Sequence, residues 1–249
     1  MQLSVVIPTY NEAENLPKLV SVLFSLPIQG LRILVVDDNS PDGTGQAADA
    51  LAESHPARLS VMHRPGKMGL GTAYIQGFQK VLRDGAEAVC QMDADFSHPP
   101  ELVLDLVNIL QHCDLALGSR YVPGGSVDNT WPFWRKGLSA FGNFYARLIL
   151  GMPVRDATGG FRVWRREALM GMPLERVRSN GYAFQVEMTY IACKLGYRIM
   201  EIPFYFADRK WGQSKMSFHI QREAAIRVWQ LLFEYRALSP KPHQLDQSG

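Results

Sequence analysis

The chain has 249 residues, of which 47% are hydrophobic and 20% are charged, so it has enough apolar material to bury a sizeable core. Its 26 lysines and arginines nearly balance its 24 aspartates and glutamates, and the formal net charge is +2. That balance excludes a nucleic-acid-binding protein that relies on bulk positive charge. Any anion site must therefore be local.

The N-terminal sequence and the cysteines favour a reducing compartment. The first residues, MQLSVVIPTYNE, lack the basic and long apolar segments of a signal peptide. No uncharged apolar run reaches the roughly 18 residues of a transmembrane helix, so we expect none. The three cysteines, Cys90, Cys113 and Cys193, are widely spaced, which predicts buried thiols and argues against structural zinc.

The first half of the chain alternates β-rich runs with segments of helical spacing. We predict strands at 3–7, 31–40, 59–64, 86–93 and 113–121. We predict helices at 12–26, 44–54, 72–84 and 99–111. Asn11 is the predicted N-cap of the first helix. This alternation predicts an α/β fold with a doubly wound, mostly parallel sheet of the Rossmann-like type.

The second half contains more aromatic and basic residues. Its predicted elements are a helix at 134–150, a loop at 155–169, a helix at 180–197, a strand at 198–209 and an amphipathic helix that ends near 235. We expect a single domain over 1–238. The remaining residues, 239–249, are predicted to be a disordered tail.

Polar or glycine-rich sequence follows four of the predicted strands. The four segments are 8–11, 37–38, 64–71 and 93–95. In parallel α/β sheets, ligands bind beyond the carboxyl ends of the strands. We therefore expect these segments to share one site, and their convergence is a stronger indication than any single motif.

Asp93 and Asp95 end the fourth predicted strand and are separated by one residue. Mg²⁺ typically takes one or two carboxylates together with substrate phosphates, so this pair predicts a cation site beside a diphosphate. Solvation of the loop or capping of the next helix is the alternative. The stretch DADFS also resembles the nucleophile loop of dehalogenase-type phosphatases, but that loop lies near the start of its domain.

Two further segments offer contacts for a nucleotide. Asp37 and Asp38 can accept hydrogen bonds from a base or a ribose, although DDNSPDGT is equally typical of a turn. The stretch RPGKMGLG offers Lys67 and backbone amides near a helix N-terminus, an environment that suits an anion. It matches neither a Walker A loop nor the glycine pattern of dinucleotide-binding folds.

Separated polar residues in the second half suit a phosphate. They are Arg120, Arg135, Ser139, Arg209 and Lys215. Guanidinium groups bind phosphate bidentately, and groups from several segments can converge on one phosphate. The alternative is solvation, or pairing with acids such as Asp128 and Asp156.

A series of motifs occurs in order: VVIPTYNEAENL, VVDDNSPDGT, RPGKMGLGTA, MDADFSHPPE, GSRYVPGG, DATGGFR, GYAFQVEM and DRKWGQSK. Over about residues 3–235 the chain resembles the dolichol-phosphate and polyprenyl-phosphate mannose synthases of glycosyltransferase family 2. The resemblance implies a GT-A fold and transfer of mannose, with inversion, from GDP-mannose to a polyprenyl phosphate. It is highly specific to lipid-phosphate glycosyl transfer and less specific to mannose.

The resemblance also assigns site residues by position. The nucleotide-sugar pocket matches Pro8, Tyr10, Glu12, Asp38, Lys67, Asp93 and Asp95. The site for Mg²⁺ or Mn²⁺ matches Asp93, Asp95 and Ser97, although many relatives carry the longer glutamine in place of Ser97. The acceptor phosphate matches Arg120, Arg135, Ser139 and Arg209, with Lys215 close by. Catalysis is assigned to Asp93, Asp95, Arg120 and Arg209, the nucleotide-sugar-binding half to 1–121 and the acceptor-binding half to 122–238.

A lipid acceptor implies contact with a membrane. We expect a cytoplasmic protein at the cytoplasmic face of a membrane, attached peripherally or recruited by a small membrane-anchoring subunit. Residues 131–150 and 216–236 have the aromatic and basic composition of interfacial helices, and core-facing amphipathic helices are the alternative. The residues proposed to face lipid include Trp131, Phe133, Trp134, Phe141, Phe144, Leu148, Ile226, Trp229 and Phe233, with Arg147, Arg222, Arg227 and Arg236 at the headgroups.

Several alternatives to mannosyl transfer stay open. A UDP-glucose donor would keep the fold and the lipid but change the sugar. Transfer to a polysaccharide hydroxyl would need a general base, whereas a phosphate is already anionic near neutral pH. No histidine suits that role, because His98 behind the acidic loop is interpreted as structural. A dehalogenase-type phosphatase and a non-catalytic nucleotide-binding subunit are the alternatives from other classes.

Overall fold

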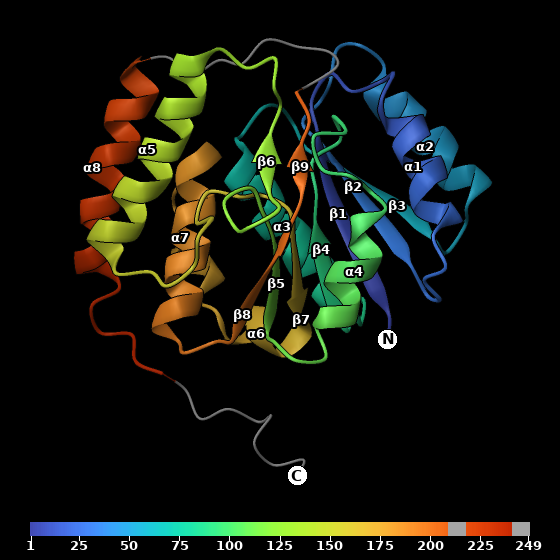
Figure 1. Cartoon of the computed structure of the whole chain (residues 1–249). Helices are drawn as coiled ribbons and strands as arrows, with labels where there is room; N and C mark the ends of the chain where they lie inside the picture. The colour runs from blue at the N-terminus through green and yellow to red at the C-terminus, as the bar shows by residue number, and fades with distance from the viewer. Residues whose placement is uncertain (209–217, 241–249) are drawn as a thin grey trace.

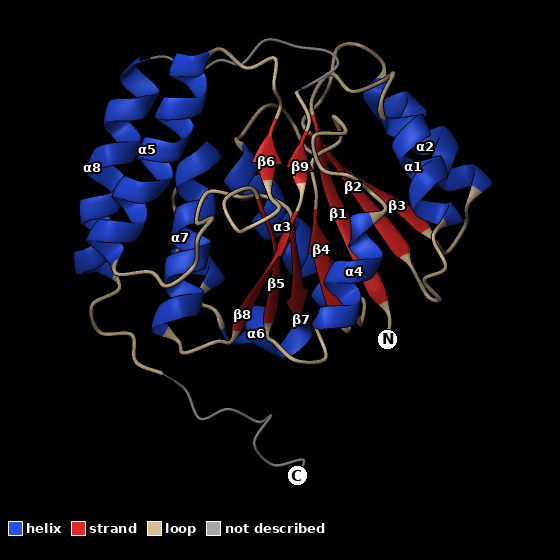
Figure 2. Ribbon diagram, viewed as in Figure 1, coloured by secondary structure: helices blue, strands red, loops and turns tan. Residues whose placement is uncertain are grey.

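The computed structural model describes residues 1–208 and 218–240. A seven-stranded sheet in the order β3-β2-β1-β4-β7-β5-β8 runs through its centre, with helices on both faces (Figure 1). The strands are β1 (Leu3–Thr9), β2 (Arg32–Asp37), β3 (Leu59–His63), β4 (Ala88–Gln91), β5 (Leu115–Ser119), β7 (Arg162–Arg165) and β8 (Ile199–Pro203). A short ribbon of β6 (Ser126–Val127) and β9 (Tyr205–Phe206) lies near the carboxyl ends of the large sheet, as Figure 2 shows.

The helices form layers on the sheet. One face is covered by α1 (Leu16–Ser25), α2 (Thr44–Ser54) and α4 (Leu102–Ile109). The other face is covered by α3 (Leu70–Arg83), α6 (Arg166–Gly171) and α7 (Gly181–Lys194). Two long helices, α5 (Phe133–Leu150) and α8 (Phe218–Glu234), lie outside that second layer, where α8 packs against both α5 and α7.

The predicted mostly parallel α/β sheet is confirmed, with one strand that the sequence did not indicate. Every pairing in the large sheet is parallel except those of β7, which lies antiparallel between β4 and β5. The prediction of a loop over 155–169 is therefore wrong, because β7 lies within it and α6 begins within it. β7 has only four residues and passes directly into α6, so it is too short to show a period-2 pattern.

The predicted cap of the first helix is also wrong. The helix α1 begins at Leu16, and Asn15 occupies the cap position. Asn11 instead adopts a left-handed backbone with φ of 64°, a conformation that asparagine tolerates better than most residues. Residues 11–15 form a turn in which the amides of Asn15 and Leu16 donate to the carbonyl of Glu12.

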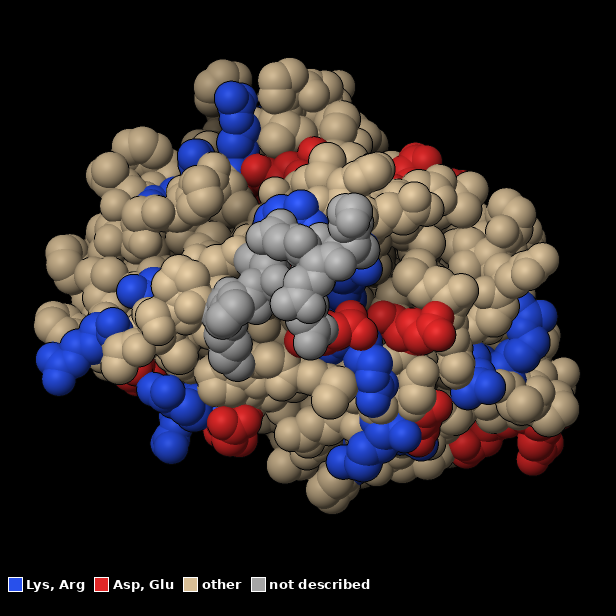
Figure 3. All heavy atoms as spheres, turned by 90° about the horizontal axis from the view of Figure 1, so that it is seen from below, with Lys and Arg blue, Asp and Glu red and all other residues tan. Residues whose placement is uncertain are grey.

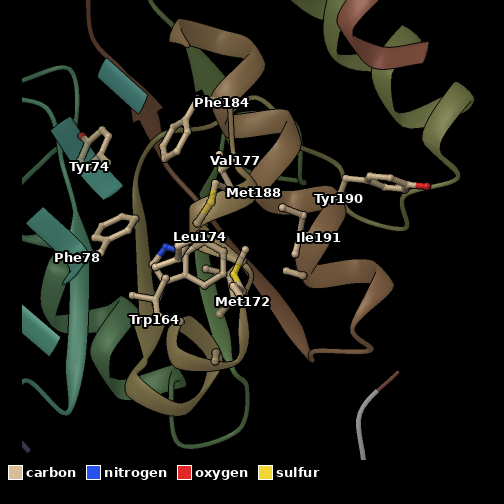
Figure 4. Packing of buried hydrophobic residues seen from close by; sticks show 14 of the residues in the cluster. Tyr74, Phe78, Trp164, Met172, Leu174, Val177, Phe184, Met188, Tyr190 and Ile191 are labelled. Carbon is tan, nitrogen blue, oxygen red and sulfur yellow. The ribbon is translucent and has the colours of Figure 1, made fainter. Parts of the chain in front are cut away.

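The buried core follows the alternation of the strands. Along β1, Leu3, Val5 and Ile7 point toward α1 and α4, whereas Val6 points toward α3. Figure 4 shows the apolar layer on the face of the sheet covered by α3 and α7. There Trp164 of β7 packs among residues of α3, of α7 and of the segment 172–177 before α7. These two apolar layers share one sheet. The predicted division into halves at 121 and the predicted tail stay predictions, and residues 241–249 lie outside the described part of the chain.

The amino ends and the carboxyl ends of the parallel strands lie at opposite edges of the sheet. The edge formed by the amino ends of the parallel strands, seen from below in Figure 3, carries basic and acidic side chains interspersed. The carboxyl ends of β1, β2, β3, β4, β5 and β8 all reach the opposite edge. Within residues 1–208 and 218–240, no helix combines the length and apolar character needed to cross a membrane.

Candidate active site

The acidic loop after β4 is held by hydrogen bonds from two directions. The Tyr74 hydroxyl of α3 donates to Asp93 Oδ1 at 2.9 Å. Asp95 Oδ1 accepts from the backbone amide of Ser97 at 3.0 Å and from its hydroxyl at 2.6 Å. Asp95 and Ser97 are buried, and Asp93 is half-buried. The bonds from Tyr74 and Ser97 restrict the rotation of both carboxylates at the sheet edge.

His98 supports this loop from behind. Its ring is buried and stacks on Phe161 with the ring centres 5.0 Å apart. The backbone amide of Asp93 donates to His98 Nδ1 at 3.1 Å, so the ring nitrogen that faces the loop is an acceptor. His98 therefore contacts the backbone of the loop, as its interpretation as a structural residue predicts.

Asp38, which follows β2, holds the neighbouring loop 64–71 in place through an ion pair with Arg64. Arg64 Nη1 lies 2.8 Å from Asp38 Oδ1, and both side chains are buried. Burial raises the pKa of Asp38, and the Arg64 guanidinium offsets that rise only in part. Arg64 Nη2 also donates to Thr72 at 2.6 Å, at the start of α3. Asp38 thus positions the loop that carries Lys67.

The other residues assigned to the nucleotide lie around the same strand ends. Lys67 Nζ sits 4.1 Å above the centre of the exposed Tyr10 ring. Glu12 accepts a hydrogen bond from Asn15 at 2.8 Å, and its backbone amide donates to Thr44 at the start of α2. Pro8 lies within β1, in register with Val36 of β2.

Gly69 allows loop 64–71 to pack against the chain before α7. Its φ is +99°, and a Cβ atom there would lie 2.6 Å from the side-chain oxygen of Asn180. The loop therefore contacts α7 on one side and carries Lys67 on the other.

The basic residues assigned to the acceptor phosphate are paired with acids. Arg120 Nε donates to Asp156 Oδ2 and Arg120 Nη2 to Asp156 Oδ1, each at 2.8 Å. Arg135 on α5 lies 3.2 Å from Asp208, and its guanidinium stacks 3.7 Å above the Trp131 ring. The sequence analysis named pairing with Asp156 as an alternative to phosphate binding by these arginines. Among the described residues, Asp128 accepts hydrogen bonds from Thr130 and from the backbone amide of Asp208.

Tyr121 connects the first of these arginines to α5. The Tyr121 hydroxyl lies 2.8 Å from the hydroxyl of Ser139, one helical turn beyond Arg135. The Arg120 guanidinium lies 5.3 Å from the Tyr121 ring centre. Arg120 and Ser139 therefore both contact Tyr121, and Arg135 lies one helical turn before Ser139. The predicted site residues Arg209 and Lys215 lie outside the described part of the chain.

A continuous set of contacts joins the acceptor-side residues to the acidic loop. The Arg120 guanidinium lies 5.3 Å from the centre of the Phe206 ring. Phe206 meets His98 edge to face at 6.0 Å, and His98 binds the backbone of Asp93. The two clusters thus lie on the same edge of the sheet, separated by two aromatic rings.

The acidic loop suits a divalent cation that substrate oxygens help to bind. Within residues 1–208 and 218–240, no three His, Cys, Asp or Glu side chains gather into a complete cation site. Two carboxylates with a buried hydroxyl form a partial set of oxygen ligands, which fits Mg²⁺ or Mn²⁺ bound together with a diphosphate. The residues that would hold the ion are Asp93 and Asp95. The Ser97 hydroxyl already donates to Asp95.

The sequence matches the family model of glycosyl transferase family 2 over residues 4–171. The chain belongs to this family. It is 48% identical over 225 residues to a polyprenol monophosphomannose synthase of Mycolicibacterium smegmatis, covering 90% of this chain and 84% of the relative. It is 43% identical to an undecaprenyl-phosphate mannosyltransferase of Micrococcus luteus, covering 96% and 98%. The family resemblance inferred from the motifs is confirmed, and the dehalogenase-type alternative loses its support.

Solved structures confirm the fold of this family 2 glycosyltransferase. Glucosyl-3-phosphoglycerate synthase from Mycobacterium tuberculosis, in complex with Mn²⁺ and UDP, matches with a TM-score of 0.63 at 20% identity, covering 96% of this chain and 81% of that one. A mannosyltransferase from Pyrobaculum calidifontis, in complex with GDP-mannose and Mn²⁺, matches with a TM-score of 0.60 at 21% identity, covering 97% and 66%. At these identities the likeness establishes the fold alone.

The sequence analysis missed several residues that hold the site. Tyr74 lies on a face of α3 that its spacing marks only as buried, and segment 64–71 was expected at the site without a role for the Arg64 side chain itself. No local pattern reveals either role, because their partners come from other elements.

The cysteines match their predicted role in part: Cys90 and Cys113 are buried and Cys193 is half-buried. Burial raises the pKa values of Cys113 and Cys193 to about 11, so both thiols stay protonated.

Proposed function

We propose that this glycosyltransferase transfers mannose from GDP-mannose to a polyprenyl or dolichyl phosphate and inverts the anomeric centre. The observation that supports this most directly is the contact series from Arg120 through Phe206 and His98 to the acidic loop. This series supports the proposal because the residues assigned to the acceptor phosphate lie only two aromatic rings away from those assigned to the diphosphate. The relatives named as mannosyltransferases of polyprenyl phosphates support the sugar and the acceptor class.

The reaction needs no strong general base. A phosphate monoester has its second pKa near 6, so at neutral pH its oxygen is already a nucleophile. That oxygen attacks the anomeric carbon of mannose from the side opposite GDP. The new carbon–oxygen bond forms as the bond to the β-phosphate of GDP breaks, and the bonding pair leaves with GDP. A single displacement inverts the configuration at the anomeric carbon.

In this proposal the residues of the chain supply binding and orientation. Asp93 and Asp95 would hold Mg²⁺ or Mn²⁺, which supplies electrostatic stabilisation of the diphosphate leaving group. Tyr74 and Ser97 keep those carboxylates in place through the bonds described above. Arg120 and Arg135, with Ser139 beside them, orient the acceptor phosphate in line with the donor. Arg209 and Lys215 are assigned to the same phosphate by the family resemblance alone.

We further propose that α5 and α8 rest on the cytoplasmic surface of a membrane. The exposed apolar side chains on these adjacent helices are Phe133, Trp134, Phe141, Phe144 and Leu148 of α5 and Ile226, Trp229 and Phe233 of α8. Phe133 is 93% exposed, so it has no place in the core. Trp229 Nε1 donates to the Tyr145 hydroxyl at 3.0 Å, which fixes the two apolar faces side by side.

Two residues expected at this surface are elsewhere. Trp131 is buried beneath Arg135 and packs on Phe206, so it belongs to the site. Arg227 turns inward from α8 and binds the buried Glu187 of α7. The composition of these segments had placed Trp131 among the lipid-facing residues and Arg227 at the headgroups, but the partners of both side chains are remote in sequence. The side chain of Arg222 lies outside the described residues, and recruitment by a membrane-anchoring subunit stays a prediction.

The proposed reaction is tested with radiolabelled donors. Incubation with GDP-mannose, Mg²⁺ and undecaprenyl phosphate is expected to move label into the organic phase. UDP-glucose in the same assay is expected to give no extractable label. Label from UDP-glucose alone would replace the donor in the proposal. Absence of lipid-linked label from either donor would favour a polysaccharide acceptor or a non-catalytic subunit.

The membrane proposal predicts loss of vesicle binding in the triple variant Phe133→Ser, Phe141→Ser, Leu148→Ser. Burying such a side chain contributes roughly 1.5–3 kcal/mol, so partial insertion of three predicts at least about a 100-fold drop in partitioning. Flotation with vesicles of phosphatidylethanolamine and phosphatidylglycerol measures it. The matched control is Met170→Ser, which alters an apolar side chain of α6 that is 61% exposed. Equal flotation of the triple variant and the wild type would contradict the assignment.

A further inference from the structure

The Arg120 guanidinium is held on one side by a single buried carboxylate. Asp156 accepts from the Arg120 backbone amide at 3.0 Å, from Nε at 2.8 Å and from Nη2 at 2.8 Å. Nη2 also donates to the Thr158 hydroxyl at 2.7 Å. Asp156 is fully buried and Arg120 nearly so. Among the described residues these bonds use Nε and Nη2, and Nη1 makes no further hydrogen bond.

The loop that carries Asp156 is itself fixed from several sides. Glu201 of β8 accepts from the backbone amides of Arg155 and Asp156. Asn143 of α5 accepts from the amide of Ala157 at 2.9 Å and donates to the carbonyl of Arg155 at 2.6 Å. The backbone that carries the Asp156 carboxylate therefore cannot shift away from Arg120 without breaking bonds to two other elements.

Beneath this loop lies a second buried guanidinium, that of Arg162. Its Nε donates to the carbonyl of Gly159 at 2.8 Å, and its Nη2 donates to the carbonyl of Gln185 at 3.0 Å. Burial lowers the pKa of Arg162 to about 10. Burial alone would raise the pKa of Asp156, but the adjacent Arg120 holds it below its ordinary value. Asp156 therefore stays ionised between these guanidinium groups.

This arrangement limits what Arg120 can offer to a ligand. The edge of the guanidinium bearing Nε and Nη2 is occupied, so a phosphate can meet only the Nη1 side. The centres of the Tyr121 and Phe206 rings each lie 5.3 Å from the guanidinium carbon of Arg120. The nearby carboxylate also offsets the positive charge of Arg120. A phosphate bound there would be oriented by directed hydrogen bonds and would keep the negative charge that it needs to attack.

We propose that Asp156 is a positioning residue for the acceptor phosphate, which it acts on through Arg120 without touching the phosphate itself. The inference rests on the proposed function, in that it takes the Arg120 side of the site as the acceptor side. Thr158 assists by accepting a hydrogen bond from Nη2 of Arg120, the nitrogen that also donates to Asp156. The donor side of the site does not depend on this pair.

The test compares Asp156→Asn and Thr158→Val with the wild type, using farnesyl phosphate as a water-soluble acceptor probe. For Asp156→Asn, loss of a charge-assisted bidentate pair predicts about a 10-fold rise in the dissociation constant and in the KM for farnesyl phosphate. For Thr158→Val, loss of one hydrogen bond predicts about a threefold rise. The KM for GDP-mannose is expected to stay unchanged in both. Isothermal titration in the presence of GDP gives the dissociation constant without turnover.

The matched control is Asp114→Asn, at the opposite end of β5 from Arg120. Asp114 is also buried, and it accepts from the backbone amide of Arg198 at 2.7 Å. A general loss of packing would raise both KM values equally in Asp156→Asn and in this control. If Asp156→Asn does not fold, Thr158→Val decides the question.

The outcomes separate the two proposals. Unchanged affinity and KM for farnesyl phosphate in Asp156→Asn and Thr158→Val would overturn the role of Asp156, even with a fully active wild type. A wild type that transfers no mannose would instead overturn the proposed function. The titration of farnesyl phosphate would still decide whether Asp156 positions Arg120 for a phosphate.

Discussion

Asp95→Asn is expected to lower kcat about 1,000-fold, equivalent to about 4 kcal/mol of transition-state stabilisation. The substitution keeps the shape of the side chain, and its amide oxygen can still accept the hydrogen bond of Ser97. It removes the negative charge that would hold a divalent cation against the leaving diphosphate. A radiolabel assay with GDP-mannose and farnesyl phosphate measures turnover, and titration of Mn²⁺ in the presence of GDP measures metal affinity.

The control for this variant is Asp105→Asn on α4. Asp105 is exposed and lies within α4, not at the end of a strand. Its loss of charge is therefore expected to change neither kcat nor the affinity for Mn²⁺. Equal loss in both variants would point to net charge as the cause. Normal turnover in Asp95→Asn would remove the metal-holding role from the proposal.

Arg135→Met is expected to reduce kcat/KM for farnesyl phosphate about 100-fold, because a guanidinium fork that can bind phosphate bidentately is lost. The methionine chain can still cover the Trp131 ring that the guanidinium now stacks upon. Arg135 pairs with Asp208 at a half-exposed position, so the structural cost of losing that pair is small. The KM for GDP-mannose is expected to stay unchanged.

Two companion variants give this prediction its specificity. Lys136→Met removes a positive charge from the next residue of α5, whose Nζ only donates to the carbonyl of Asn129. It is expected to retain normal kinetics. Arg135→Lys keeps the charge but loses the fork, so partial recovery is expected. Full activity in Arg135→Met, or equal losses in Arg135→Met and Lys136→Met, would mean that Arg135 does not bind the acceptor.

Much of the nucleotide side followed from local sequence. The apolar run LRILVVD and the predicted helix over 72–84 indicated β2 and α3 from the sequence. The parallel arrangement then placed the ends of β1, β2 and β4 on one edge. This succeeded because strand and helix periods are written in neighbouring residues, and chain reversal through helices leaves few ways to order the strands.

The acceptor side depended on partners that are distant along the chain. Arg120 meets Asp156 across 36 residues, and Arg227 turns toward Glu187 across 40. The strand β7 is defined by its pairing with β4 and β5 more than by its own four residues. The aromatic and basic composition of 131–150 and 216–236 placed Trp131 and Arg227 at a membrane surface, but both side chains bind partners elsewhere in the fold.

The amino-acid sequence by itself determined the kinds of element, the edge of the sheet that carries the site and the chemistry of the acidic pair. Only the tertiary structure decided which carboxylate holds which guanidinium, and therefore which edge of Arg120 faces the site. The physical reason is the separation along the chain of the residues that determine each feature. Backbone periodicity depends on residues within a few positions of one another, whereas a buried ion pair forms only when packing excludes water from two remote segments at once.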